Sequence, residues 1–600
     1  MLLIIALVPL AIAPGLLSAF DITPKIVILL FCESVMLLFC KRLVNGFWKL
    51  YESTFGRLYV VCLATLWLST AVSTVWSSNP MLSLAGSSWR RDGLMAESAL
   101  LLFALMAVSW FAEDRNRIRV VLRTAVITGA AASLYGIAQY FGWDPLPSSN
   151  DYQAGEGIFT IVRPPSTFGH ADYFASWLVI IAFFALALLP GEGGLWQISA
   201  RITLALAALA IVLSGTRSAL LGLLTGAIVF VGIARPRPTR AMALTLAASL
   251  ACLAAFYISP AGAKLRARVH WSLDDVRGGA RLLLWRDSLL MAMHRPWLGY
   301  GPETFTAQFP PFESVELSRA YPDFYHESPH NMFLDALVSR GIPDALAVLA
   351  LCGLAFGASR KQPALAGALA GAITCQQFMV FTIPTALYFH LLIAIVIAFA
   401  IHRSGRSPLN AMPGTRFLVP SAAVIAIVFL LIATCLLVAD RAMAVTEHRA
   451  AAGDVLGAGR AYRTARIWDP SPGDEDLRFS RAMTRLAATT PVLATSVAAA
   501  QQAIDSGIRA TETAEDRQNA WYNFATIAAL RNDRAGVEQG LRRAINCAPN
   551  WFKPHWALSQ LLELTGRHAE ARREASLAME LDGGHDPEVI ATYRQITGRP

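Results

Sequence analysis

The feature that most constrains this chain is a succession of long apolar runs separated by short polar segments. A helix needs roughly 20 apolar residues to cross the hydrocarbon core of a bilayer. Hydrophobic residues form 55% of the 600-residue chain and charged residues only 16%, proportions typical of membrane proteins. The sequence therefore predicts an all-α, polytopic membrane protein. About thirteen transmembrane helices are expected, near residues 2–20, 26–40, 58–76, 94–112, 120–141, 173–189, 202–214, 218–234, 241–259, 343–358, 364–382, 385–401 and 417–438.

Lysine and arginine are distributed unevenly over the loops between these runs. If the N-terminus lies inside, the inside loops carry most of the cations, which is the positive-inside pattern. The predicted orientation places the N-terminus in the cytoplasm and, after an odd number of helices, the C-terminus outside. Two long segments, 142–172 and 260–342, are then outside as well. The inside loops carry Lys41, Arg42, Lys49 and Arg57; Arg115, Arg117 and Arg119; Arg201; Arg235, Arg237 and Arg240; Arg360 and Lys361; and Arg403 and Arg406.

Charge and cysteine content exclude several other classes of protein. The formal net charge of +9 comes from short clusters between apolar runs rather than from one basic face, so no nucleic acid partner is expected. The eight cysteines form neither a disulfide framework nor a metal-binding pattern. The N-terminus has no Lys or Arg before its first apolar run and no clear cleavage site, which favours a retained first span over a removable signal peptide.

The polar segment 439–600 contains an internal repeat. Two stretches superimpose at an offset of about 34 residues, which pairs Tyr522 with Trp556 and Ala544 with Ala578. This period is typical of tetratricopeptide helix pairs, which stack into a concave surface. The expected function is docking of a protein partner outside the cytoplasm; a purely solubilising appendage is the alternative.

Residues 324–333, FYHESPHNMF, contain the pattern H-E-x-x-H. A zinc protease places two such histidines one helical turn apart, with the glutamate between them as general base. Here Pro329 removes a backbone donor and moves Ser328 away from helical angles, so the helix that zinc requires is expected to be broken. No metal site is therefore predicted.

A different helix is expected to begin at this proline, with Ser328 as its N-cap and Pro329 as its first residue. His330 and Asn331 would then lie at a helix N-terminus on the outer membrane face. Backbone donors and the helix dipole favour an anion there. This predicts a ligand that carries phosphate, with a histidine in an ordinary capping loop as the alternative.

Several arginines of the predicted outside segments lie beside points where the chain enters the membrane. Arg217 falls in a very short turn at membrane depth, where an unpaired guanidinium costs about 2.5 to 3.5 kcal/mol, so an anionic partner is expected. Arginine suits phosphate because its planar fork donates two hydrogen bonds. Arg91, Arg163 and Arg281 stand in comparable positions. Each also has a simpler interpretation: a local pair of Arg90 or Arg91 with Asp92, a turn flank for Arg163 and a solvated helix face for Arg281.

Taken together, five motifs resemble those of the O-antigen ligase family, which also includes O-antigen polymerases and bacterial protein O-oligosaccharyltransferases. They stand in family order and cover roughly residues 60–400. The motifs are LAGSSWRRDGL, RPPSTFGHADYFASWL, LSGTRSALLGLL, RLLLWRDSLLMAMHRPWLGYGPETF and HESPHNMFLDALVSRGIP.

The resemblance implies a membrane-embedded glycosyltransferase of the GT-C type, which takes a glycan from undecaprenyl pyrophosphate on the periplasmic side of the bacterial inner membrane. No metal, nucleotide or other cofactor is implied. The family's turn arginine corresponds to Arg217, and the arginine of its R-x-x-x-W stretch to Arg281. The arginine before the S-x-F-G turn corresponds to Arg163, and the histidine of the H-N pair to His330. The family often has asparagine where this chain has His170.

On this hypothesis, Arg163, Arg217 and Arg281 hold the pyrophosphate and stabilise the charge that develops on it. His330 acts as general base on the acceptor hydroxyl, or orients it. The expected catalytic residues are therefore His330 and Arg217. Further ligands for pyrophosphate or glycan are expected at Arg91, Arg163, Arg281, His326 and Asn331.

The chain is expected to consist of a membrane domain, 1–438, with a family-like core at about 60–400 and a long periplasmic loop at 260–342. A periplasmic tetratricopeptide domain, 439–600, follows. The expected acceptor is the lipid A-core or a protein, at a hydroxyl or an amide. An O-antigen ligase fits the motifs best, with a polymerase or a protein O-oligosaccharyltransferase as alternatives. A transporter of lipid-linked sugars and an envelope scaffold are alternatives of another class.

Overall fold

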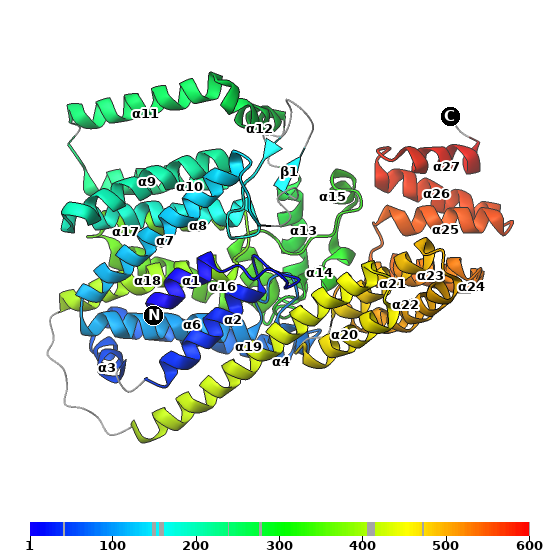
Figure 1. Cartoon of the computed structure of the whole chain (residues 1–600), viewed down its shortest axis with the longest axis horizontal. Coiled ribbons are helices and arrows are strands. Elements are labelled where there is room, and N and C mark those ends of the chain that lie inside the picture. The colour runs from blue at the N-terminus through cyan, green and yellow to red at the C-terminus, as the bar shows by residue number, and fades with distance from the viewer. Residues whose placement is uncertain are drawn as a thin grey trace.

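The computed structural model describes residues 1–39, 43–146, 152–154, 161–237, 239–274, 279–404, 415–470 and 473–598. Lys41, Arg42 and Arg406, on which the predicted orientation partly depends, lie outside these residues. The described chain is helical apart from two short antiparallel strands, β1 (Gln153–Ala154) and β2 (Ile161–Val162). Figure 1 shows a large helical bundle and a smaller C-terminal group of helices, joined by the long helix α19.

Each predicted apolar run contains a helix, so the predicted all-α class is confirmed. These helices are α1 (Leu2–Leu10), α2 (Thr23–Leu37), α4 (Thr54–Val75), α6 (Leu94–Glu113), α7 (Asn116–Tyr140), α8 (Ala171–Leu188), α9 (Gly194–Ser214), α10 (Arg217–Ala234), α11 (Arg240–Ile258), α16 (Met332–Ser359), α17 (Pro363–Cys375), α18 (Ile383–Ser404) and α19 (Thr415–Ala451).

Fewer helices are long enough to cross a bilayer than the expected thirteen. Within the described ranges, nine helices have the required length and apolar character, or ten if the bent pair of α11 and α12 (Ala263–Asp274) forms one span. Helices α1, α2 and α17 are shorter, at 9, 15 and 13 residues. The first predicted run, 2–20, is helical only over α1, and Lys25 Nζ of α2 donates to the carbonyl oxygens of Pro9 (2.7 Å) and Ala11 (2.8 Å) at the end of that helix. The chain is a multi-pass membrane protein.

Helix α10 packs against α17 through glycines spaced four residues apart on both helices. A Cβ atom on Gly226 would lie 2.6 Å from the carbonyl oxygen of Gly367, and one on Gly222 would lie 2.8 Å from that of Gly371. Such small-residue spacing allows the backbones of membrane helices to approach closely. As a result, the N-terminal end of α10 lies beside the C-terminal end of α17, where Cys375 Sγ is 3.5 Å from the carbonyl oxygen of Ser218.

The segments between the spans form a layer at one end of the bundle, on the side that faces the C-terminal helices (Figure 1). A small apolar core, which includes Leu284, Met291, Phe305 and Phe309, holds this layer together. The short helices here are α5 (Pro80–Ala85), α12, α13 (Arg281–His294), α14 (Phe305–Gln308) and α15 (Val315–Ala320), whereas α3 (Val44–Glu52) lies next to α6.

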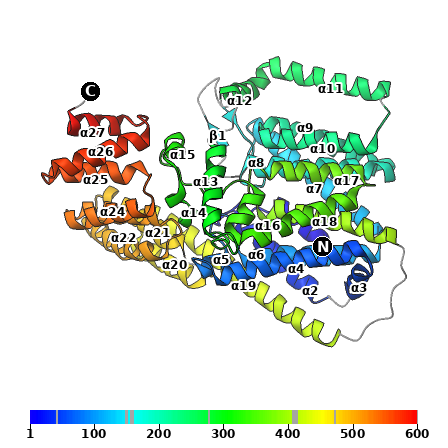
Figure 2. The ribbon, with the colours of Figure 1, turned by 180° about the vertical axis from the view of Figure 1, so that it is seen from behind.

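The C-terminal helices form consecutive antiparallel pairs (Figure 2). Helix α25 begins 35 residues after α23, at Phe552 against Arg517, and α26 begins 34 residues after α24, at His568 against Arg534. These offsets agree with the repeat expected from the sequence. The helices are α20 (Val455–Trp468), α21 (Asp474–Thr489), α22 (Leu493–Thr513), α23 (Arg517–Leu530), α24 (Arg534–Cys547), α25 (Phe552–Leu564), α26 (His568–Asp582) and α27 (Pro587–Thr597).

Candidate active site

The turn between α9 and α10 places Arg217 at the first position of a helix. Gly215 ends α9 in the left-handed conformation (φ 62°), which glycine adopts without steric cost, and Thr216 is the N-cap of α10. Arg268, from α12, lies directly over this turn and donates from Nε to the carbonyl oxygen of Gly215 at 3.1 Å. A Cβ atom on Gly215 would be only 2.5 Å from the Arg268 side chain, so the glycine also makes room for it.

Two arginines share one indole ring at this turn. The guanidinium carbon of Arg268 is 4.2 Å from the centre of the Trp271 ring, and that of Arg217 is 5.7 Å from it. The ring stabilises both cations through its quadrupole. Arg268 is buried, and its positive charge therefore acts in a medium of low dielectric. The arrangement concentrates positive potential at the N-terminus of α10, which is itself the positive end of a helix dipole.

Arg163 reaches the same turn through an aspartate. Its Nη2 forms an ion pair with Asp172 Oδ1, and Thr216 Oγ1 donates to that same oxygen at 2.9 Å. Asp172 lies in the first turn of α8, and the N-cap of that helix is His170, whose Nδ1 accepts from the Asp172 backbone N–H at 3.2 Å. The Nε of Arg163 is buried and has no hydrogen-bond partner among the described residues. One donor of Arg163 is therefore available to a ligand.

The predicted start of α16 is wrong by three residues. The N-cap is Asn331 rather than Ser328, and its Oδ1 accepts from the backbone N–H groups of Phe333 (3.0 Å) and Leu334 (3.2 Å). His330 has a positive φ of 50°, which a right-handed helix cannot contain. The segment from His326 to His330 is not helical, so the helix that a zinc protease motif requires is absent from it, as the proline predicted.

Burial and nearby positive charge keep the imidazole of His330 neutral. Burial lowers the pKa of His330 to about 4, and the positive charges of Arg281 and Arg90 add to this effect. Asp172 acts on the imidazole in the opposite direction. Arg281, Asp172 and His330 are therefore close enough for their charges to interact, although they are far apart in the sequence.

The turn between α17 and α18 joins the helix ends that carry these residues. The carbonyl oxygen of Gln376 accepts from the Met332 backbone N–H at 2.9 Å, and Gln377 Oε1 accepts from Asn331 Nδ2 at 3.1 Å. The Phe378 ring lies under Arg281, with the guanidinium carbon 5.9 Å from the ring centre. Cys375, directly before this turn, contacts Ser218 of α10, so the N-termini of α10, α13 and α16 all lie near one short segment.

A second buried ion pair fixes the first turn of α16. Arg90 Nε donates to Glu303 Oε1 at 2.6 Å, and Arg90 Nη1 is 3.5 Å from Asp335 Oδ2. Glu303 also accepts from the backbone N–H of Ser87 at 3.3 Å. The segment 86–93 is thereby held against α16, close enough for the charge of Arg90 to act on His330.

The predicted site residues fall into two groups. Arg163 is linked through Asp172 to the turn that carries Arg217, and Arg281 is close enough to His330 and Asp172 for its charge to act on both, while Asn331 caps α16. Arg91 and His326 lie elsewhere. The guanidinium of Arg91 donates to Asp469 Oδ2 at 2.6 Å and so pairs with the C-terminal region rather than with Asp92, and His326 lines a separate pocket.

Sequence reasoning missed Asp172, Thr216, Arg268 and Trp271. Asp172 had a readable signal, since an acidic residue in the first turn of an apolar run needs a partner. Thr216 also had one, because it directly precedes a helical run and its residue type is favoured at N-caps. Arg268 had none, because its position over the Gly215 turn depends on how α12 folds back on the bundle.

Fold and site together define a multi-pass membrane protein with a cationic, histidine-containing site at the ends of its helices. Residues 202–350 match the protein-family model Wzy_C, whose description is O-Antigen ligase. The chain thus carries a domain of the O-antigen ligase family, which is a family of enzymes. The family implies a lipid-linked glycan as one substrate and an acceptor as the other. The match includes Arg217, Arg268, Arg281 and His330, whereas Arg163 and Asp172 precede it. No curated protein matches the chain.

Proposed function

We propose that this protein transfers a glycan from undecaprenyl pyrophosphate to an acceptor hydroxyl or amide on the periplasmic face of the bacterial inner membrane. It acts as an O-antigen ligase and needs no metal ion. The observation that carries the proposal has two parts. Arg163, Arg217 and Arg268 meet at the Gly215 turn, and Arg281 is close enough to Asp172 and to a neutral His330 for its charge to act on both. A pyrophosphate is the group that such a set of arginines and helix N-termini binds best.

The arginines act on the leaving group. As the bond between the anomeric carbon and the pyrophosphate oxygen breaks, the electron pair of that bond remains on the pyrophosphate. Arg217 and Arg268 stabilise this charge from the Gly215 turn, and Arg163 contributes its free Nε. Donors that are already in position need no reorganisation during the reaction, which is why such sites lower the barrier.

His330 acts on the acceptor. The acceptor oxygen attacks the anomeric carbon from the face opposite the pyrophosphate, and its proton passes to the imidazole. A single displacement of this kind inverts the anomeric centre. In the free protein the pKa of His330 is about 4, which makes it a weak base. Pyrophosphate would offset the charges of Arg281 and Arg90, so donor binding raises this pKa and makes the imidazole a stronger base.

The test is transfer in proteoliposomes that contain the lipid-linked glycan, with a chelator present. Lipid A-core and candidate proteins are offered as separate acceptors. Product on lipid A-core identifies a ligase, whereas product on a protein identifies a protein O-oligosaccharyltransferase. Glycan elongation without either acceptor identifies a polymerase. Absence of product with every acceptor, or its loss on chelation, contradicts the proposal.

We also propose that residues 439–600 form a tetratricopeptide domain in the periplasm, with the N-terminus in the cytoplasm, and that this domain docks a protein partner. The support is the repeat of α23–α24 by α25–α26 and the continuity of α19, which leads from the bundle into these helices. The test is labelling of Cys547, on α24, in intact cells with a reagent that does not cross membranes, with the other native cysteines replaced by serine. Labelling only after lysis would place this domain in the cytoplasm.

A further inference from the structure

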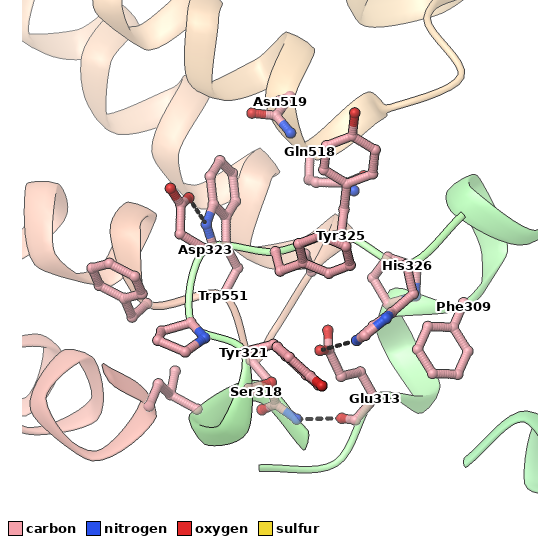
Figure 3. Close-up of a pocket in the computed structure, with 17 residues that line it drawn as sticks. Phe309, Glu313, Ser318, Tyr321, Asp323, Tyr325, His326, Gln518, Asn519 and Trp551 are labelled. Atoms are coloured by element: carbon pink, nitrogen blue, oxygen red, sulfur yellow. Dashed lines mark hydrogen bonds and ion pairs between the residues drawn. The ribbon is translucent and has the colours of Figure 1, made fainter. Parts of the chain in front are cut away.

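A second pocket lies between the outside loop that leads to His330 and the C-terminal helices (Figure 3). Its empty space of about 530 Å³ includes the open solvent at its mouth. Tyr321, Phe324, Tyr325 and His326 line it from the loop, and Gln518 and Trp551 line it from the C-terminal region. The site described above uses none of these side chains.

The walls of this pocket combine exposed aromatic rings with amide and carboxyl groups. Tyr321, Phe324 and Tyr325 are 37%, 55% and 46% exposed, which is high for aromatic side chains beside a pocket. Polar groups stand among them: Figure 3 shows Gln518 and Asn519 near Tyr325, and Glu313 near His326. Flat aromatic surfaces cover the C–H faces of sugar rings, and amides and carboxyls bond to sugar hydroxyls.

A buried histidine that lines the pocket has an unused hydrogen-bonding atom. His326 is 5% exposed, and its Nε2 has no hydrogen-bond partner among the described residues. The nearest carboxyl oxygen, Glu313 Oε1, is 3.7 Å away, which is too far for a hydrogen bond. Burial lowers the pKa of His326 to about 4 and raises that of Glu313 to about 8, so both groups are neutral near pH 7. A neutral donor and a neutral acceptor suit a sugar hydroxyl better than an ion.

The pocket also lies at a suitable distance from the reacting centre. His330 follows His326 by four positions, and an extended chain of that length spans at most roughly 14 Å. A glycan attached at the anomeric carbon beside His330 could reach the pocket within a few sugar units. The C-terminal region also contributes an aromatic ring, that of Trp551. Its Nε1 donates to Asp323 Oδ1 of the loop at 3.1 Å, which holds the ring beside the loop.

We propose that this pocket is a saccharide subsite, which binds a sugar unit remote from the bond that is formed. The proposal rests on the glycosyl transfer proposed above, and either the donor glycan or a glycan on the acceptor supplies the sugar. In this role the C-terminal region contributes side chains to glycan recognition in addition to docking a partner.

Binding is tested first without the reaction. Oligosaccharide is released from the lipid-linked pool of the cells that make the protein, and its saturation-transfer NMR signal is measured with the full-length protein in detergent. Tyr325→Ala and Gln518→Ala are expected to reduce this signal, and Tyr325→Phe to retain it. Trp468→Ala is the matched control, because Trp468 is a C-terminal aromatic residue that is 40% exposed and does not line the pocket. An unchanged signal in Tyr325→Ala and Gln518→Ala overturns the proposal.

Transfer kinetics distinguish the source of the sugar. If the donor glycan occupies the pocket, Tyr325→Ala raises KM about tenfold for donors of several sugar units and leaves KM for a one-unit donor unchanged. If a glycan on the acceptor occupies it, KM for the acceptor rises whatever the donor length. Equal KM values in Tyr325→Ala and wild type contradict the subsite. A wild-type protein that binds the oligosaccharide but transfers nothing refutes the proposed function and leaves the subsite standing.

Discussion

His330 illustrates how single charges set the chemistry of this site. Its imidazole can accept a proton only in the neutral form, which is present at pH values above its pKa. Burial and two nearby guanidinium groups lower that pKa to about 4 in the free protein. Bound pyrophosphate would cancel part of the positive charge. The profile of kcat/KM reports the free enzyme, and the profile of kcat reports the enzyme with its substrates bound.

The acid limbs of these two profiles are therefore predicted to differ. As the pH falls, kcat/KM should stay constant until about pH 4 to 5, whereas kcat should begin to fall at a higher pH, because bound pyrophosphate offsets part of the nearby positive charge. Steady-state transfer measured from pH 4 to 8 in proteoliposomes checks this. A kcat limb at a lower pH than the kcat/KM limb would contradict the proposed effect of the donor on His330.

Arg217 is predicted to act through both its charge and its forked geometry. Arg217→Ala should lower kcat about 10²- to 10³-fold, because one preorganised donor to the leaving group is lost. Arg217→Lys keeps the charge but not the paired donors, and should recover part of this loss. The control is Arg286→Gln, which removes a half-exposed arginine of α13 that pairs with Asp287. An Arg217→Ala variant as active as Arg286→Gln would exclude Arg217 from the reaction.

The site residues that could be predicted from the sequence are those whose own neighbours in the chain already show that a buried charge needs a partner. Arg217 stands in a turn at membrane depth, and an isolated charge there requires a partner wherever the rest of the chain goes. Arg268 occurs in an ordinary basic stretch, and only the fold places it over the Gly215 turn. The two candidates that lie elsewhere, Arg91 and His326, belong to motifs of the sequence, but their side chains contact the C-terminal region and line a separate pocket.

At the scale of elements, the position of Arg217 depends on how closely α10 approaches α17. Gly226→Ala is predicted to force these helices apart, because the new Cβ would lie 2.6 Å from a backbone oxygen of Gly367 and 2.5 Å from the Phe183 ring. Overpacking of this kind costs about 1 to 3 kcal/mol. Thermal unfolding in detergent and transfer activity should both decrease.

Gly232→Ala is the matched control in the same helix, since no atom lies within 4 Å of its added Cβ. It should leave both stability and activity unchanged. If Gly226→Ala and Gly232→Ala behave alike, the close packing of α10 on α17 does not position the site. The glycine spacing is readable in the sequence as GLLTG and GALAG, but the pairing of these two segments is not.

The start of α16 shows why helix ends are harder to predict than helices. Ser-Pro is a common way to begin a helix, and the sequence contains Ser328-Pro329 directly before an apolar run. The structure instead gives His330 a left-handed conformation and uses Asn331 as the cap. The contact of Asn331 with Gln377, 46 residues away, favours this later start, and no local rule includes such a contact.

At the scale of the whole molecule, a buried ion pair connects the C-terminal helices to the catalytic layer. Arg91 and Asp469 are 10% and 2% exposed, whereas Arg319 and Glu580, another pair across this boundary, are 44% and 53% exposed. Arg91→Ala is predicted to lower the free energy of docking of the C-terminal helices by about 3 to 5 kcal/mol, because it leaves a buried carboxylate without its partner. Arg319→Ala should cost about 1 kcal/mol or less.

The difference between Arg91→Ala and Arg319→Ala is measured by limited proteolysis of the junction between α19 and α20 at increasing urea concentration. Replacing both partners, as in Arg91→Leu with Asp469→Leu, should be less harmful than Arg91→Ala alone, because no charge is then left unpaired. Equal effects of Arg91→Ala and Arg319→Ala would show that the buried pair does not hold the two regions together.

Docking of the C-terminal helices is also predicted to weaken as pH rises. Burial raises the pKa of Glu475 and Glu515 well above the usual range, and neighbouring carboxyl groups add to the effect. The docked state therefore keeps protons that the exposed groups would release above pH 4.5, so docking loses free energy with increasing pH. Hydrogen exchange of α21, corrected for intrinsic rates, should be slower at pH 5.5 than at pH 8. Glu515→Gln should reduce this dependence, and an unchanged dependence would contradict the assignment.

The expected number of thirteen spans exceeds the number of helices that are long enough, because apolar composition does not reveal helix length. Apolar runs identify every buried helix of the bundle, but composition does not separate a helix that crosses the bilayer from a short one inside it. Helix α17 is apolar because most of its residues are buried against other helices, and its 13 residues do not reach across. Helix α1 is buried on one face only, and its 9 residues are too few as well. The division of the chain into a bundle and a polar helical region, in contrast, depends on average composition and could be predicted.

The measurement that tests the central claim most directly compares wild type, His330→Ala and His294→Ala in chelator-treated proteoliposomes that contain the lipid-linked glycan and an acceptor. His294 lies on α13, where its Nδ1 contacts the carbonyl oxygen of Leu290, and it has no place in the proposed reaction. We expect transfer by wild type and by His294→Ala, and a rate about 10²- to 10⁴-fold lower in His330→Ala, because the general base is lost. Equal rates in all three proteins would contradict the proposed mechanism.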